Sequence, residues 1–147
     1  MIKFVDGDLF ESGADALVNT INCVGVAGKG VALEFRNRYP KWFIDYKQEC
    51  RRGIRPGDVW PWHTGTDFPP RYILNFATKD HWRNPSKLVW IEEGLNNLAQ
   101  KLTLLDINSV AVPALGCSNG GLSWISVAPL FRVLESHPCE ILVYRPH

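Results

Sequence analysis

The sequence of 147 residues lacks several features that would place it in a special class. No apolar run approaches the roughly 18 residues that a membrane-spanning helix needs, and no internal repeat or low-complexity segment is present. The first residues, MIKFV, read directly as a strand, so we expect no signal peptide. These absences favour a single cytoplasmic domain, and hydrophobic residues, at 46% of the chain, suffice for its core.

The cysteines form neither a metal-binding pattern nor a disulfide framework. Cys23, Cys50, Cys117 and Cys139 are widely spaced, without a C-x-x-C pair and without a histidine at the spacing of a zinc ligand. We therefore expect no metal and no cofactor. We expect the four side chains to be free, buried thiols in a reducing compartment.

The net charge of +1 is not typical of a nucleic-acid-binding protein, but the charge is unevenly distributed. Eight basic residues and only three acidic ones lie between Lys29 and Arg55, and a second cluster, KDHWR, spans residues 79–83. Such a bias can steer a polyanion toward the protein. A solvated helix face accounts for it equally well, so the charge pattern leaves both interpretations open.

Apolar segments of strand length alternate with segments of helical periodicity along the whole chain. We expect strands at 2–5, 16–21, 58–63, 71–77, 109–113 and 140–144, and helices at 30–39, 42–52, 88–104 and 122–134. Ser123 is expected to cap the last helix, and Pro129 to limit its start or to kink it. The alternation predicts an α/β layered domain with a largely parallel central sheet.

Two glycine-rich segments each follow a predicted strand. Residues 19–33 (NTINCVGVAGKGVAL) pass through two asparagines and three glycines into a helix, and residues 116–121 read GCSNGG. Glycines let the backbone approach a ligand closely, and free N–H groups at a helix start attract anions. Ligands of parallel sheets bind outside the carboxyl ends of the strands. The two segments together predict one crevice for a phosphate-bearing ligand.

The first glycine segment is not a standard nucleotide-binding motif. A Walker motif requires G-x-x-x-x-G-K followed by serine or threonine, whereas Gly30 follows Lys29 here and no hydroxyl is placed to hold Mg²⁺. The dinucleotide fingerprint G-x-G-x-x-G is also absent. A tight turn before a helix would explain the glycines, but it would not explain Asn19, Asn22 or the second loop.

Several motifs, in their order along the chain, resemble those of the macrodomain family. They are GDL at 7–9, ADALVNTIN at 14–22, GKG at 28–30 and VPALG at 112–116. The resemblance extends from about residue 2 to residue 144. It implies one domain over residues 1–147 with a three-layer α/β/α fold, a mixed and largely parallel sheet, and a site for ADP-ribose.

Two segments narrow the resemblance to one branch of the family. Residues 22–32 (NCVGVAGKGVA) and 75–83 (NFATKDHWR) are similar to the branch that holds terminal ADP-ribose protein glycohydrolase and the DarG-type DNA ADP-ribosyl glycohydrolases. DarG-type proteins are antitoxins that remove ADP-ribose from thymidine in single-stranded DNA after a DarT-type toxin has attached it.

The branch implies a hydrolase of a toxin–antitoxin system that reverses DNA damage. Its expected partners are ADP-ribose, ADP-ribosylated single-stranded DNA and the cognate DarT-type toxin, with no membrane. The branch also implies a further C-terminal region in the full-length protein.

The resemblance assigns roles to individual residues. Asp8 corresponds to the carboxylate that receives the adenine amino group, and the catalytic residues are Lys79 and Asn22, the latter facing the distal ribose. The implied contacts with ADP-ribose come from Asp8, Leu9, Thr20, Asn22, Gly28, Lys29, Gly30, Val31, Pro113, Ala114, Leu115, Gly116, Cys117, Ser118, Asn119, Gly120, Gly121 and Leu122.

Cleavage at ribose C1″ builds oxocarbenium character, and a lysine suits this chemistry. A partly desolvated Lys79 near Lys29 and Arg83 would have a lowered pKa, so that its neutral amine could form a Schiff-base adduct. A charged Lys79 that only contacts phosphate is the alternative.

The second glycine loop bears on the substrate, because the protein-directed glycohydrolase of the branch carries an acidic residue there and this chain has none. The difference favours a DNA substrate, for which we expect Trp82 to stack on an extruded base and His81 or Arg83 to meet the DNA backbone. A surface aromatic beside a loop histidine is the simpler interpretation. The same pocket would also serve protein-linked ADP-ribose, O-acetyl-ADP-ribose, ADP-ribose 1″-phosphate or a reader without turnover.

Overall fold

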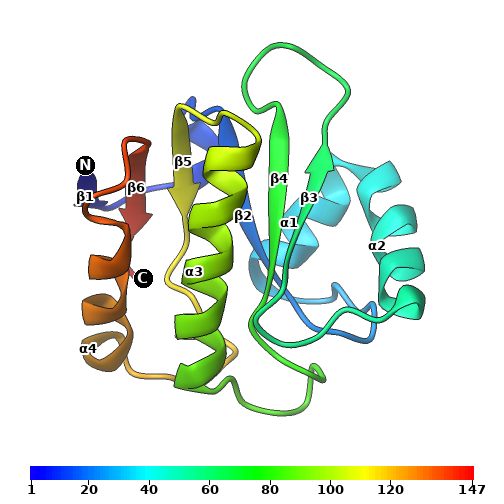
Figure 1. The fold of residues 1–147 in the computed structure, drawn as a ribbon. Coiled ribbons are helices and arrows are strands. Elements are labelled where there is room, and N and C mark those ends of the chain that lie inside the picture. The colour runs from blue at the N-terminus through cyan, green and yellow to red at the C-terminus, as the bar shows by residue number, and fades with distance from the viewer.

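The computed structural model describes all residues from 1 to 147 and contains one six-stranded sheet (Figure 1). The strands lie in the order β1-β6-β5-β2-β4-β3. Their bounds are β1 Ile2–Val5, β2 Ala16–Ile21, β3 Val59–His63, β4 Tyr72–Ala77, β5 Ser109–Val112 and β6 Glu140–Tyr144. Every neighbouring pair is parallel except β3 and β4. The mixed, largely parallel sheet expected from the sequence is confirmed.

Helices cover both faces of the sheet, so the domain has three layers. Figure 1 shows α3 in front of the strands and α1 behind them. The α-helices are α1 Gly30–Arg38, α2 Pro40–Arg52, α3 Leu88–Leu104 and α4 Trp124–Val127, and the 3-10 helices are η1 Leu9–Glu11 and η2 Ala128–Leu134. No helix combines the length and the apolar character that crossing a membrane would take.

Alternation along each strand divides the buried side chains into two cores. In β4, Leu74 and Phe76 pack with α3 and η2, whereas Ile73 and Ala77 pack with α1 and α2. Because both faces are covered, the central strands are apolar at nearly every position, as is usual for parallel sheets. This burial explains why the sequence shows short apolar runs rather than a polar–apolar alternation.

Two buried asparagines face each other at the centre of the sheet. Asn19 of β2 and Asn75 of β4 are partners in the register, and Asn19 Nδ2 donates to Asn75 Oδ1 at 3.1 Å. The same oxygen accepts from Nε1 of Trp42 in α2 at 2.9 Å, and Asn75 Nδ2 donates to the carbonyl of Trp60 in β3 at 3.0 Å. Asn19, which the sequence suggested as part of a ligand-binding site, is therefore an internal structural residue.

The last helix differs from the expectation of a single helix over 122–134. The α-helical part begins at Trp124, and a 3-10 helix continues from Ala128, where Pro129 occupies one of the first positions. Proline has no N–H to donate, so the α-helical bond pattern is interrupted there. Ser123 is the N-cap residue, as expected, but its side chain makes no capping bond; its carbonyl accepts from the N–H groups of Ser126 and Val127.

The expectation of buried thiols holds for one cysteine. All four are free, but only Cys139 is buried, and Cys23, Cys50 and Cys117 are partly exposed. Cys23 and Cys117 lie near the carboxyl edge of the sheet, where loops cover them incompletely.

Gly94 allows α3 to pack directly onto the sheet. A Cβ built on Gly94 would overlap the ring of Phe76 in β4. A glycine inside a helix normally costs about 1 kcal/mol relative to alanine, so the close helix–strand approach is what this residue provides.

We expect Gly94→Ala to destabilise the protein by about 2–3 kcal/mol, because the new methyl group overpacks the core. At an exposed helical site the same substitution would stabilise the protein, because alanine favours a helix more than glycine does. The free energy of unfolding, measured by chemical denaturation, checks this. In the double variant Gly94→Ala/Phe76→Leu the effects should be less than additive, since leucine removes the ring that the methyl group meets. A stabilised Gly94→Ala variant would contradict the packing.

Candidate functional site

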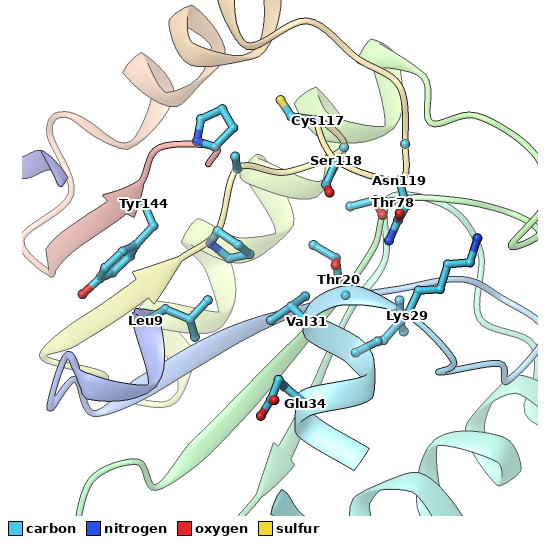
Figure 2. Close-up of a pocket in the computed structure, with 18 of the residues that line it drawn as sticks. Leu9, Thr20, Lys29, Val31, Glu34, Thr78, Cys117, Ser118, Asn119 and Tyr144 are labelled. Carbon is cyan, nitrogen blue, oxygen red and sulfur yellow. The ribbon is translucent and has the colours of Figure 1, made fainter. Parts of the chain in front are cut away.

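A cleft of about 1150 Å³ opens at the carboxyl ends of the parallel strands (Figure 2). It brings together most of the residues that the sequence pointed to, from five separate segments of the chain. These are Asp8, Leu9, Thr20, Asn22, Gly28, Lys29, Gly30, Val31, Lys79, Trp82, Pro113, Ala114, Gly116, Cys117, Ser118, Asn119 and Gly120.

Five expected site residues do not line the cleft: His81, Arg83, Leu115, Gly121 and Leu122. Leu115 is fully buried in the core on the α3 side, and Leu122 packs against that core. Both leucines support the glycine loop from behind. His81 and Arg83 contact the indole of Trp82 instead, with ring centroids 5.4 Å apart for His81 and the Arg83 Cζ 4.6 Å from the ring centroid.

The structure adds cleft residues that the sequence did not reveal. They are Gly7, Phe10, Ile21, Val26, Ala32, Glu34, Arg38, Thr78, Tyr144, Arg145, Pro146 and His147. Glu34 and Arg38 follow Val31 at helical spacing, which is a signal that could have found them. The C-terminal residues line the cleft because β6 lies between β1 and β5. No local sequence pattern predicts this strand order.

Asn22 organises the first glycine segment from within. Its Oδ1 accepts from the N–H groups of Val24, Gly25 and Val26 at 3.1–3.3 Å, and its Nδ2 donates to the Val26 carbonyl at 2.7 Å. The hydroxyl of Tyr46 in α2 lies 2.7 Å from the Asn22 carbonyl and 2.9 Å from Oδ1. The second N–H of the amide makes no hydrogen bond within the chain.

The first glycine segment is tied to the turn that carries Lys79. The N–H of Cys23 donates to the Asp80 carbonyl at 3.2 Å, and Cys23 Sγ donates to the Lys79 carbonyl at the same distance. Asp80 Oδ1 in turn accepts from the N–H of His81 and from Asn84 Nδ2. The segment 22–26 and the turn 79–84 therefore form one end wall of the cleft.

The amine of Lys79 lies in this end wall. Its Nζ donates to the Trp82 carbonyl at 3.3 Å. Burial, and then the nearby positive charge of Lys29, lower the pKa of Lys79 below its ordinary value. The cation is therefore less favoured at this position than at an open surface.

The second glycine loop, residues 116–121, forms the wall opposite α1. Gly116 and Gly121 have φ values of +73° and +75°, which side chains rarely allow. Figure 2 shows Asn119 of this loop facing the segment of Lys29, and a Cβ on Gly30 would lie 3.0 Å from Asn119 Nδ2. The two loops thus approach each other over the middle of the cleft and offer backbone N–H groups there.

The opposite end of the cleft is aromatic and acidic. Asp8 Oδ1 accepts from the N–H of Phe10 at 2.9 Å, which leaves Oδ2 free for a ligand. Arg38 lies over the Phe10 ring, 4.2 Å from its centroid, and pairs with Glu34 at 3.1 Å. Burial, followed by the charges of Asp8 and Glu11, raises the pKa of Tyr144 at this end.

Comparison with known proteins shows which family this sequence matches. Residues 18–131 match the model of the Macro domain family. The chain is 50% identical over 149 aligned residues to a protein of Mycobacterium tuberculosis named DNA ADP-ribosyl glycohydrolase, covering 99% of this chain and 42% of the relative. The chain thus spans less than half the length of that relative.

Solved structures are similar over the whole chain. The macrodomain of Thermus aquaticus DarG has a TM-score of 0.94 and 44% identity, with 99% of both chains covered. Thermosipho africanus DarTG, solved in complex with ADP-ribose, has a TM-score of 0.91 and 32% identity, covering 99% of this chain and 41% of that one.

We expect Tyr46→Phe to destabilise the protein by about 1–2 kcal/mol and to loosen residues 22–26, because the buried hydroxyl that holds Asn22 is lost. Thermal unfolding and amide hydrogen exchange measure the two effects. Tyr39→Phe is the matched control, since the Tyr39 hydroxyl makes no hydrogen bond within the chain. Equal behaviour of the two variants would show that Tyr46 does not organise the segment.

Proposed function

Because this chain belongs to the macrodomain family, we propose that it binds ADP-ribose and removes it by hydrolysis from a modified nucleobase, thymidine, in single-stranded DNA. The observation that carries the proposal is the position of the Lys79 amine, which lies in one end wall of the cleft beside the exposed Trp82. The similarity to DNA ADP-ribosyl glycohydrolases over 99% of the chain supports the same reading.

The cleft suits the three parts of ADP-ribose in order. Asp8 Oδ2 is a free acceptor for the amino group of adenine at one end. The two glycine loops supply backbone N–H groups for the diphosphate in the middle, where Lys29 adds a positive charge. The distal ribose then lies at the other end, beside Lys79 and the free N–H of Asn22.

We assign the chemistry to the neutral amine of Lys79. It attacks C1″, the bond from C1″ to the base nitrogen breaks, and the base leaves with a proton. The ribose ring opens to give an imine on Lys79, and water hydrolyses the imine to release ADP-ribose and restore the amine. Asn22 holds the segment against which the ribose lies.

We place the DNA outside the Lys79 end of the cleft. Trp82 is 42% exposed there, so its indole offers a surface on which an extruded base can stack. His81 and Arg83, packed against the indole, lie beside this surface and suit contacts with the DNA backbone.

The proposed physiological partner is a DarT-type toxin, whose modification the enzyme reverses. The solved DarTG complex with ADP-ribose supports both the ligand and this pairing. We also propose that these residues are the macrodomain of a longer protein, since they match only 42% of the length of the curated relative.

We expect wild-type protein to release unmodified DNA from an ADP-ribosylated oligonucleotide, and Lys79→Ala to lower the rate about 10²–10⁴-fold, as loss of a proton-transfer or nucleophilic group does. Reduction with cyanoborohydride during turnover should attach ADP-ribose to Lys79, detected by mass spectrometry.

Lys101→Ala, on the far part of α3, is the control and should keep full activity. ADP-ribose binding by Lys79→Ala, measured by calorimetry, should persist. Equal release by wild type and Lys79→Ala, or release from protein-linked or small-molecule substrates alone, would contradict the proposal.

The lowered pKa of Lys79 gives the pH dependence a definite sign. Since the neutral amine is the active form, kcat should rise with pH up to the pKa of Lys79 and then level off. This rising limb of the pH profile should lie below the pH range in which an ordinary lysine titrates. Lys29→Met removes a positive charge that lowers this pKa, so the limb should move to higher pH. Lys101→Met should leave it in place. A kcat that falls as the pH rises through this range would indicate a Lys79 that acts as a cation.

We expect Trp82→Ala to lower kcat/KM for the modified oligonucleotide by a factor of about 5–150, because stacking on a base is worth about 1–3 kcal/mol. Affinity for free ADP-ribose should change much less. Phe68→Ala is the matched control, since Phe68 is exposed in the β3–β4 loop, at the amino end of β4. Equal losses for oligonucleotide and free ADP-ribose would place Trp82 in the nucleotide site instead.

A further inference from the structure

Ser86 lies behind the second glycine loop and has a hydroxyl group without a partner. The residue is 4% exposed, and its Oγ is buried and makes no hydrogen bond. The N–H of the same residue donates to the Gly120 carbonyl at 2.9 Å, so the backbone of Ser86 already holds the loop. A buried hydroxyl without a partner is unfavourable, and natural structures rarely keep one without a reason.

The start of α3 does not explain this serine. A serine at this place normally caps a helix through its side chain. Here Lys87 is the N-cap residue, and no side chain caps the helix. The Ser86 Oγ lies against the glycine loop instead, because a Cβ on Gly120 would overlap both this oxygen and the Gly116 carbonyl oxygen.

The glycines in front of Ser86 leave the backbone of the loop free to change its conformation. Gly120 and Gly121 are adjacent, and Gly121 already has a φ of +75°. A peptide group beside a glycine rotates with little steric cost, and the peptide between Asn119 and Gly120 has no backbone hydrogen bond to lose. Phosphate oxygens draw backbone N–H groups toward themselves, so a diphosphate in the cleft would reorient this peptide. The nearest buried polar group without a partner is the Ser86 hydroxyl.

We propose that Ser86 is a positioning residue for the diphosphate: when ADP-ribose binds, a backbone group of the peptide between Asn119 and Gly120 forms a hydrogen bond with the Ser86 hydroxyl and holds the loop closed. This inference rests on the proposed ADP-ribose site. Ser86 belongs to the same β4–α3 connection, residues 78–87, as Lys79 and Trp82. Closure of the loop therefore also steadies the segment that carries the reacting amine.

Two serine variants separate this role from a general effect on folding. Without ligand, Ser86→Ala should unfold at the wild-type temperature or higher, because it removes a hydroxyl that bonds to nothing. Its affinity for ADP-ribose, measured by calorimetry, should fall about 5–10-fold, as expected for one lost hydrogen bond. Ser109→Ala should do the reverse: Ser109 Oγ accepts from the N–H of Asp15 at 2.9 Å and does not line the cleft, so stability falls and affinity stays.

Amide hydrogen exchange gives a second readout. ADP-ribose should protect residues 116–122 in the wild type and in Ser109→Ala, and this added protection should be lost in Ser86→Ala, with equal exchange in the free proteins. If Ser86→Ala keeps wild-type affinity and protection, or if it is destabilised without ligand, the inference about Ser86 is wrong while the proposed function stands. If the wild type does not bind ADP-ribose at all, the inference falls together with the proposed function.

Discussion

The buried amide of Asn75 fixes how the two central strands lie against each other. It accepts from Asn19 and Trp42 and donates to the backbone of Trp60, so one side chain connects three strands and α2. A slip of one residue between β2 and β4 would turn every side chain to the other face and leave these groups unpaired. The resulting register sets Ile21 beside Ala77, so that the segments of Asn22 and Lys79 leave the sheet together.

The cleft combines a fixed part with an adjustable part. The segment 22–26 is held by Asn22, Tyr46 and the bonds of Cys23, and these contacts exist without any ligand. The Lys79 side chain and the loop 116–121 have fewer constraints, because the lysine makes one long hydrogen bond and the loop is rich in glycine. Such a division suits the proposed reaction, in which the protein first holds a nucleotide and then brings an amine to one carbon atom.

The sequence was sufficient wherever a local pattern decides the structure. Helix α3 has the predicted bounds, because its apolar spacing is long and regular, and both glycine loops lie at the carboxyl edge because strand direction puts them there. The position of β6 between β1 and β5 has no local signal, so the wall formed by Tyr144 and its neighbours was missed. Asn22 lies in the cleft as predicted, but its four hydrogen bonds within the loop depend on a backbone path that only the folded chain reveals.

The short connection between β4 and α3 gives the domain a modular design. Its first part, residues 78–83, holds Lys79 and Trp82, while the contacts suited to the adenine end and the middle of the cleft come from other segments. Exchange of these six residues during evolution could change the molecule from which the nucleotide is removed without rebuilding the site that holds the nucleotide. A common nucleotide-binding domain can in this way give rise to enzymes that remove the nucleotide from different macromolecules, with one loop deciding the substrate.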